Sequence, residues 1–318
     1  MIYEYAIEPD VVATWINERQ KGRFFIDKFG PHQGRMISCF PEKWDEKVKE
    51  VVSSKNDMKR KSSKNDMKRK RLEEILFMLK MQGVQIKRKN CCWDENHGSW
   101  IENAISEHAR YPFHAILARK NPENRKEILV DEDIGYSPCV NWDVPVGAVR
   151  VERDANAMAD AVFPMLSRCR WVKFIDPFFS INETRYEKTL PAFLRILNMD
   201  RPVEREKIEI HTKKSIKSAP LKHLANYYKE IIPLGLVVTL FHWQEKKGGQ
   251  SLHNRYILTD IGGVSFSHGL DKGKKGQADV ITRLDCSLYH ELCDEYDAAS
   301  TAFEEAEKPI VITGNSKE

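Results

Sequence analysis

Two kinds of apolar pattern alternate along the second half of the chain. Short continuous apolar runs, which are typical of buried strands, lie at 171–176, 207–211 and 236–242. Apolar residues at helical spacing predict helices at 155–162, 184–197 and 218–232. We expect Pro191 to kink or restart the second helix and Ser218 to cap the third. Alternating strands and helices predict right-handed crossovers and a mainly parallel sheet.

A pair of shorter apolar runs follows this alternation. The runs HNRYILTD at 253–260 and GVSFSHGL at 263–270 meet at Asp260-Ile261-Gly262-Gly263, which is typical of a hairpin turn. The sequence therefore predicts an α/β domain with a mixed, mainly parallel sheet over residues 151–318.

The first half of the chain is less regular. A helical stretch at 11–19 is followed by turns at Gly30-Pro31 and Phe40-Pro41. Helical spacing returns in four apolar residues, Leu72, Ile75, Leu76 and Leu79. We therefore predict an α+β N-terminal domain over residues 1–150.

The boundary between these domains is indicated by composition. Residues 138–150 (PCVNWDVPVGAVR) contain two prolines and one glycine, which favour a break in regular structure. At about 150 residues per domain, a chain of 318 residues is expected to contain two.

The overall composition excludes several protein classes. With 41% hydrophobic and 31% charged residues, the chain is neither collagen-like, nor a coiled coil, nor wholly disordered. Its longest apolar run, 231–241, is about half of what a bilayer crossing needs. The N-terminus lacks a signal-peptide pattern, and the seven cysteines are irregularly spaced. These features predict a soluble, cytoplasmic protein with free thiols.

Positive charge is concentrated in one segment, the basic arm at 53–71. It contains a tandem duplication, in which SSKNDMKRK at 53–61 is repeated at 62–70. Residues 55–71 hold nine Lys or Arg and two Asp, a local charge of +7, whereas the whole chain is only +4. Nine residues add about two and a half helical turns, so the duplication is best tolerated where it projects into solvent. The arm is expected either to attract polyanions or to be a solvated segment.

Three strands are each followed by a polar residue that can do chemistry. These residues are Asp176, His211 and His242. Ligands of open parallel sheets bind outside the carboxyl ends of the strands. The three side chains are therefore predicted to share one edge, although strands also simply end at polar residues.

The sharpest chemical signal is His253-x-Arg255 followed by Asp260. Residues i and i+2 of a strand share a face, so the imidazole and the guanidinium should point the same way. That pair suits attack on a phosphate, with imidazole as nucleophile and guanidinium on the non-bridging oxygens. If this strand runs antiparallel to its neighbours, its beginning lies at the edge that holds Asp176.

This pattern resembles the phospholipase D superfamily, whose motif is His-x-Lys-x4-Asp on a strand. The resemblance covers about 155–300 with one copy of the motif. It implies that His253 is the nucleophile of a phosphohistidine intermediate and that Asp260 is a supporting acid. Arg255 stands where the family has Lys, and the following strand lacks the Gly-Ser-x-Asn of its nucleases. The chain is also similar to the phospholipase-D-like C-terminal domain of MIT-domain proteins, which implies membrane binding without catalysis.

The mechanism of the family requires a second histidine as general acid. Enzymes with a single motif obtain it from a symmetric partner, so the resemblance implies a homodimer. Within one protomer the second imidazole could instead come from His211, His242 or His268. We expect further substrate contacts from four residues, Asp176, Lys213, Ser267 and His268.

Metal sites are the competing chemistry. Asp176, His211, His242 and His253 at one edge could hold a divalent ion, although the cation of Arg255 would repel it. A second group, Cys91, Cys92, His97, His108 and His114, lacks the spacing of common zinc sites. We therefore expect no metal and no other cofactor.

Two functions follow from this pattern. The first is a metal-independent phosphodiesterase acting through a phosphohistidine, most simply a nuclease whose basic arm adds sequence-independent phosphate contacts. Bacterial proteins of this kind are also associated with phage defence. The second is a catalytically inactive module that binds nucleic acid or anionic phospholipid.

Overall fold

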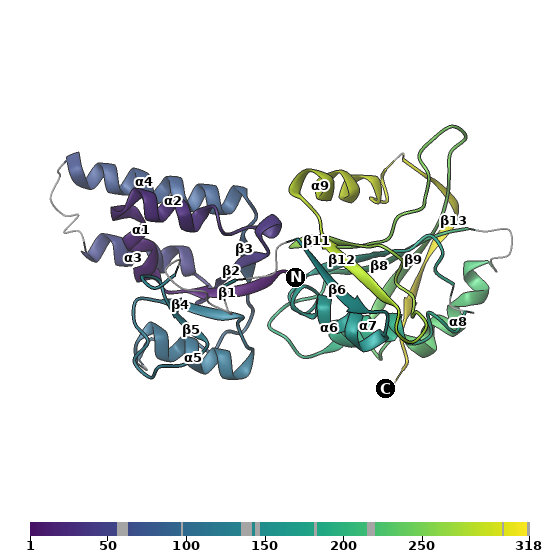
Figure 1. Cartoon of the computed structure of the whole chain (residues 1–318), viewed down its shortest axis with the longest axis horizontal. Helices are drawn as coiled ribbons and strands as arrows, with labels where there is room; N and C mark the ends of the chain where they lie inside the picture. The colour runs from purple at the N-terminus through teal and green to yellow at the C-terminus, as the bar shows by residue number, and fades with distance from the viewer. Residues whose placement is uncertain are drawn as a thin grey trace. The chain divides into compact units, whose positions relative to one another are not determined.

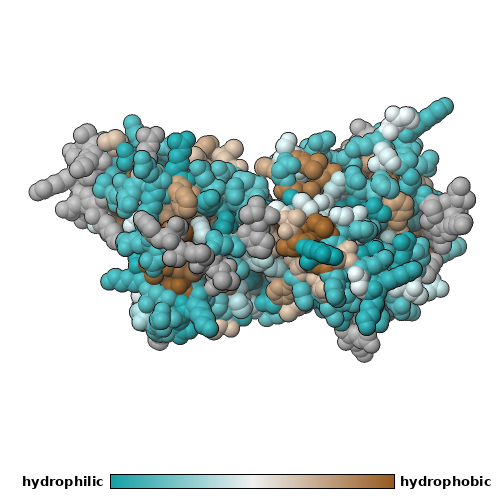
Figure 2. All heavy atoms as spheres, in the orientation of Figure 1, coloured by the Kyte–Doolittle hydropathy of each residue, from teal (hydrophilic) through white to brown (hydrophobic). Residues whose placement is uncertain are grey.

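The chain forms two compact α/β units. The computed structural model describes residues 1–55, 63–96, 98–134, 142–143, 147–180, 183–214, 220–300 and 302–316. One unit is Ile2–Val146, and the other is Gly147–Glu318 together with Met1. The structural division therefore lies at Gly147, beside the sequence-based boundary at 150. Hydrophilic residues cover most of the face of each unit that Figure 2 shows.

The N-terminal unit contains a five-stranded sheet in the order β3-β2-β1-β4-β5, with every pairing parallel. The strands are β1 Tyr3–Ile7, β2 Arg35–Cys39, β3 Gln85–Lys87, β4 Ala115–Ala118 and β5 Ile128–Val130. The helices are α1 Pro9–Asn17, α2 Arg19–Ile26, α3 Trp44–Lys55, α4 Ser63–Met81 and α5 Trp100–Arg110, with a short 3-10 turn at Pro31–Gln33. The α+β prediction is therefore wrong for this unit, which alternates strands and helices (Figure 1).

Helix α4 carries the second copy of the duplicated nonapeptide. The apolar stripe that predicted the helix, Leu72, Ile75, Leu76 and Leu79, is buried. The described part of the second copy, 66–70, is mostly exposed. Exposure on this side allows a register change there without moving the buried stripe. Residues 56–62, which include most of the first copy, lie outside the described residues.

A buried ion cluster ties the strands of this unit to helix α5. The Arg88 guanidinium donates to both carboxylate oxygens of Glu4 at 2.7 and 2.8 Å, and to Glu107 Oε1 at 2.7 Å. It also donates to the Tyr111 carbonyl at 2.9 Å. Because all three charged side chains are buried, these bonds offset their loss of hydration.

The C-terminal unit contains an eight-stranded mixed sheet in the order β13-β9-β8-β7-β10-β11-β12-β6. The strands are β6 Ala148–Glu152, β7 Trp171–Ile175, β8 Lys207–Lys213, β9 Val237–Gln244, β10 Tyr256–Thr259, β11 Gly262–Phe266, β12 Ala278–Arg283 and β13 Glu304–Thr313. Only β7–β8 and β8–β9 pair in parallel. The mixed sheet is confirmed, but "mainly parallel" is wrong, because the other five pairings are antiparallel.

Helices cover both faces of this sheet (Figure 1). They are α6 Ala155–Leu166, α7 Thr189–Asn198, α8 Leu221–Ile231 and α9 Cys286–Glu295. Leu292 of α9 packs with Ile175 and Leu258 on one face. Phe193 of α7 stacks on Phe174 on the other face, at 5.7 Å between ring centroids. Helix α7 begins five residues later than predicted.

The two predicted helix signals in this unit have different outcomes. Pro191 lies in the first turn of α7, where its missing N–H breaks no helical bond, so it neither kinks nor restarts the helix. Helix α8 begins at Leu221 after Pro220, and Ser218 lies outside the described residues.

Candidate functional site

The candidate site lies at the edge of the sheet where β7 ends and β10 begins. Strands β7, β8 and β9 are parallel, so their carboxyl ends meet at this edge. Strand β10 runs antiparallel to β7, with Tyr256 paired to Ile175, so the condition set in the sequence analysis is met. The residues just before β10 therefore lie beside Asp176, the first residue after β7.

His253 and Arg255 contact the same aromatic ring. They lie in the extended segment before β10, and not within the strand as predicted. The His253 and Phe178 rings meet edge-on, with centroids 5.5 Å apart at 90°. Arg255 Cζ lies 4.7 Å from the centroid of the same ring. The imidazole and the guanidinium are therefore neighbours on Phe178, which is itself 41% exposed.

The Arg255 guanidinium forms no ion pair within the described part of the chain, although its charge acts on the nearby Asp176 carboxylate and partly offsets the rise that burial causes in the pKa of that group. Its Nε is buried and has no hydrogen-bond acceptor, and no carboxylate of the described residues lies within 4 Å of it. Buried N–H groups are nearly always paired in folded proteins. The charge of this half-buried guanidinium beside an exposed histidine therefore suits an anionic ligand.

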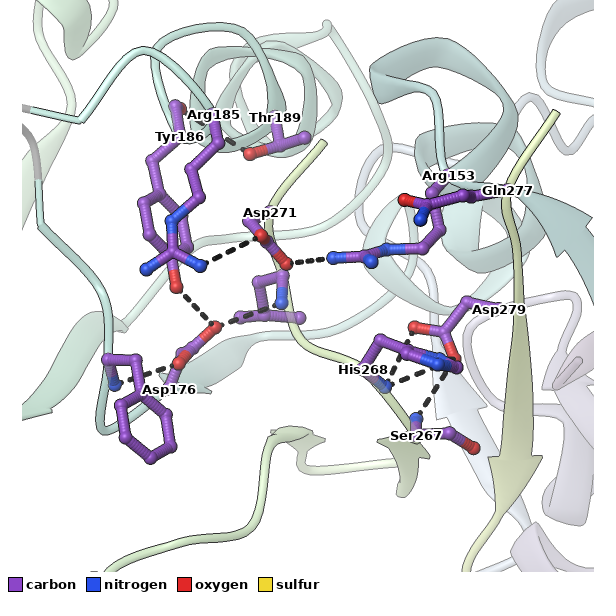
Figure 3. A network of polar contacts seen from close by, with 12 residues as sticks. Arg153, Asp176, Arg185, Tyr186, Thr189, Ser267, His268, Asp271, Gln277 and Asp279 are labelled. Atoms are coloured by element: carbon purple, nitrogen blue, oxygen red, sulfur yellow. Dashed lines mark hydrogen bonds and ion pairs between the residues drawn. The ribbon is translucent and has the colours of Figure 1, made fainter. Parts of the chain in front are cut away.

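Asp176 organises the backbone around this pair. Its carboxylate accepts the Phe178 N–H and the Leu270 N–H, both at 2.9 Å, and the Tyr186 hydroxyl at 3.3 Å (Figure 3). Burial raises the pKa of Asp176 above its ordinary value, and the backbone donors together with the charge of Arg255 offset only part of this rise. Asp176 thus holds the segments that carry Phe178 and Leu270, and it has little capacity left for a ligand.

Gly269 permits the close approach of these segments. Its φ is +134°, a region that L side chains rarely adopt. A Cβ at this position would lie 3.0 Å from Asp271 Oδ1, 3.2 Å from Asp176 Oδ2 and 3.6 Å from Arg255 Nε. A side chain here would therefore intrude between the residues of the site.

A second polar cluster fixes the loop after β11. Asp271 is buried and accepts hydrogen bonds from the guanidinium groups of Arg153 and Arg185, as Figure 3 shows. Arg185 also pairs with Glu183 at 2.6 Å. Asp271 thereby anchors this loop to Arg153, which directly follows β6, and to Arg185, which lies in the turn before α7.

His268 is held by a buried carboxylate. Its Nδ1 lies 3.2 Å from Asp279 Oδ1, while its side chain is 59% exposed and that of Asp279 is fully buried. Asp279 also accepts the backbone N–H groups of Ser267 and His268. The second nitrogen, Nε2, is thus left for other contacts (Figure 3).

The hairpin brings the two histidines to the same edge. Tyr256 pairs with Ser265, and the next step is marked by a 3.0 Å bond from the Phe266 N–H to the Arg255 carbonyl. His253 and His268 lie beyond these paired residues, one before β10 and the other after β11. Two imidazoles, one of them held by Asp279, therefore lie at the same end of the hairpin.

Two predicted catalytic histidines lie elsewhere. His211 shares a face with Ile175, its partner on β7, and therefore lies on the face opposite Asp176. It is fully buried, accepts the Trp243 Nε1–H at 2.9 Å and lies 3.2 Å from Glu209. Burial lowers the pKa of His211, and Glu209 offsets only part of this effect. It is a neutral core residue.

His242 is separated from the site by distance. It lies on β9, three strands from β10, or about 14 Å at the usual strand spacing. Its Nδ1 lies 2.6 Å from Glu307 Oε1 of β13. The predicted edge with Asp176, His211 and His242 together is therefore wrong, and so is the metal site built on it.

Asp260 lies at the far end of β10. Its carboxylate accepts the Arg170 backbone N–H at 2.7 Å and the Arg170 Nε–H at 3.1 Å. Since the four residues of β10 separate Asp260 from Arg255, Asp260 is not a supporting acid for His253. It instead fastens the start of β7 to the hairpin.

Lys213 and Ser267, both predicted to contact substrate, are engaged within the protein. Lys213 pairs with Glu245 at 2.6 Å, and Glu245 accepts the Leu252 N–H at 2.8 Å. The Ser267 hydroxyl donates to the Val280 carbonyl at 3.1 Å. Lys213 therefore steadies the segment that precedes His253.

The sequence analysis missed five residues of the site, Phe178, Arg153, Arg185, Asp271 and Asp279. The available signal was weak: Asp279 is the second residue of the short run ADVITR, and Asp271 ends the hairpin segment GVSFSHGLD. Long-range pairs such as Arg153–Asp271 leave no local pattern.

Neither a metal cluster nor a membrane helix occurs in the described part of the chain. No three His, Cys, Asp or Glu side chains there are grouped to hold an ion, and His97 of the predicted cysteine–histidine group lies outside the described residues. No described helix has the length and apolar composition that a bilayer crossing requires.

Comparisons with protein families and with curated proteins give no relative. No protein-family model matches the chain, and no curated protein is significantly similar to it.

Proposed function

We propose that the C-terminal unit is a phospholipase-D-like, metal-independent phosphodiesterase in which His253 attacks phosphorus. One observation carries the proposal: an exposed imidazole lies beside a guanidinium that forms no ion pair among the described residues. Arginine binds phosphate oxygens through charge-assisted, bidentate hydrogen bonds. An anion held by Arg255 is thus presented to His253.

The reaction is a double displacement. A His253 nitrogen forms a bond to phosphorus while the bond from phosphorus to the leaving oxygen breaks, and protonated His268 gives that oxygen a proton. Water then attacks phosphorus, His268 takes its proton, and the bond between His253 and phosphorus breaks. Asp279 supports His268 in both steps, because its buried carboxylate lies 3.2 Å from Nδ1 and holds the ring in place.

Nucleic acid is the proposed substrate. The loop that follows Asp271 exposes three lysines, Lys272, Lys274 and Lys275, which favour extended polyanions. Phe178 is 41% exposed and offers a surface on which a base can stack. Because His268 belongs to the same chain, this reaction does not require a second copy, and a homodimer stays a prediction.

A catalytically inactive binding module is the second candidate. Its support is that the nitrogens of His253 have no hydrogen-bond partner among the described residues, whereas nucleophiles are normally oriented by a neighbouring group. In this case Arg255 and His253 only grip a phosphate of nucleic acid or of an anionic phospholipid.

Hydrolysis of bis(p-nitrophenyl) phosphate and of labelled DNA and RNA, each with and without EDTA, separates the two candidates. The phosphodiesterase predicts turnover that survives EDTA and disappears in His253→Ala. His223→Ala, which removes an exposed histidine of α8, is the matched control and should retain full activity. Absence of turnover by the unmodified protein, with nucleic acid or vesicle binding intact, favours the inactive module.

A further inference from the structure

The N-terminal unit contains a cavity that the proposed function does not use. It lies among α1, α2 and α4 and has a volume of about 430 Å³. This is within the range of about 300–1,000 Å³ that small-molecule pockets occupy. The cavity and the proposed phosphodiesterase site belong to different units, so each can be tested without the other.

The floor of the cavity is apolar. It is formed by Trp15 and Ile16 of α1, Ile26 of α2, and Ile75 of α4, all of which are buried. Gly22 of α2 also lines the cavity. Helix α1 passes close to it, since a Cβ at this position would lie 2.5 Å from the Trp15 carbonyl oxygen. Helices α1 and α2 therefore pack closely at Gly22, and residues of α4 complete the lining of the cavity.

One donor in the floor has no acceptor. Trp15 is 1% exposed and stacks on Phe25 at 5.1 Å and 13°. Its Nε1 is buried and has no hydrogen-bond partner among the described residues. This N–H has almost no accessible surface, so it does not face a ligand in the cavity, and Trp15 contributes to the floor as an apolar ring.

The rim of the cavity is positively charged. Arg23, Lys70 and Arg71 line it with a single carboxylate, that of Glu74. Arg71 donates to the Ile16 carbonyl at 3.3 Å, so it is held partly in place. Arg23 and Lys70 form no ion pair within the described part of the unit. Two cations are therefore available to a bound anion.

We propose that this cavity binds a small amphipathic carboxylate, that is, an apolar chain or ring bearing one anionic group. The apolar body occupies the floor, where it is removed from water. The carboxylate lies at the rim near Arg23 and Lys70. A purely polar anion would leave the apolar floor unfilled. A cationic ligand would be repelled by the positive charges of Arg23 and Lys70 at the rim.

Calorimetric titration with decanoate, decanol and decylammonium tests the proposal on the full chain. We expect decanoate to bind with one site per chain, decanol more weakly, and decylammonium weakest. Lys70→Gln and Arg23→Gln should each weaken decanoate binding about fivefold, which corresponds to about 1 kcal/mol for a partly exposed ion pair, and leave decanol unchanged. Lys80→Gln, at the exposed C-terminal end of α4, is the matched control and should change neither.

One variant separates binding in the cavity from adsorption to the surface. Ile75→Trp fills the cavity and should abolish binding of both decanoate and decanol. The proposal is overturned if decanoate does not bind, if decylammonium binds equally well, or if Lys80→Gln weakens binding as much as Lys70→Gln does.

Discussion

Replacement of Arg255 by Met tests the site by removing its unpaired cation while keeping an apolar chain over Phe178. A hydrogen bond to a charged group contributes about 1.5–3 kcal/mol, so loss of the contact to phosphate should weaken phosphodiester binding about 10- to 150-fold. Arg255→Lys keeps the charge but loses the planar pair of donors, and we expect an intermediate effect.

The same change should have little effect on stability. The Arg255 side chain contacts Phe178 at 4.7 Å, and no described carboxylate pairs with it. A cation–π contact of this kind contributes about 0.5–1 kcal/mol. The free energy of unfolding should therefore fall by no more than about 1 kcal/mol, as measured by urea denaturation.

Binding is measured by fluorescence anisotropy with a labelled single-stranded oligonucleotide at fixed ionic strength, because salt screens all phosphate contacts. Arg150→Met, on the exposed edge strand β6, controls for the loss of one positive charge. The reasoning is refuted if Arg255→Met lowers stability by several kcal/mol and leaves binding unchanged, since Arg255 would then be a structural counter-ion of Asp176.

Three other changes probe the supporting structure. Arg88→Met should destabilise the chain by about 3–5 kcal/mol, because it leaves the carboxylates of Glu4 and Glu107 buried without their partner; a urea midpoint within error of the unmodified protein contradicts this. Gly269→Ala should abolish phosphodiester binding and lower the melting temperature only slightly, because the added Cβ, at a residue with φ +134°, intrudes between the residues of the site. Unchanged phosphodiester binding would show that the site accommodates a side chain at this position. Burial lowers the pKa of His211, so unfolding takes up a proton below the ordinary pKa of about 6.5, and stability should fall as pH drops through that range. His211→Phe should reduce this slope by up to about 1.4 kcal/mol per pH unit between pH 6.5 and 5; an unchanged slope contradicts the assignment of a neutral imidazole.

The strands and helices that follow a simple periodicity could be predicted from the sequence. The apolar runs at 171–176, 207–211 and 236–242 correspond to the three parallel strands β7, β8 and β9. Strand β13, EEAEKPIVIT, carries four charged residues and a proline, so no apolar run marks it. Its antiparallel pairing with β9 is a long-range contact that the sequence pattern does not indicate. The pattern therefore leaves this strand out and predicts a mainly parallel sheet.

The chemistry at the edge was predictable only where it was local. The spacing of His253 and Arg255 brings both side chains to Phe178, because an extended segment repeats every two residues. The same alternation places His211 on the face opposite Asp176, because His211 pairs with Ile175. This result depends on the register between β7 and β8, which the positions of the strand ends in the sequence do not give. The partner of His268 is eleven residues away on another strand, and only the register brings them together.

The most direct measurement is detection of a phosphoryl group on His253 during turnover. With bis(p-nitrophenyl) phosphate the leaving group needs no proton, so His268→Asn should form the adduct but hydrolyse it slowly. Mass spectrometry of a neutral-pH digest in EDTA should then find one p-nitrophenylphosphoryl group on the peptide that contains His253. Turnover by the unmodified protein without any adduct in either form, or an adduct on another residue, would contradict nucleophilic attack by His253.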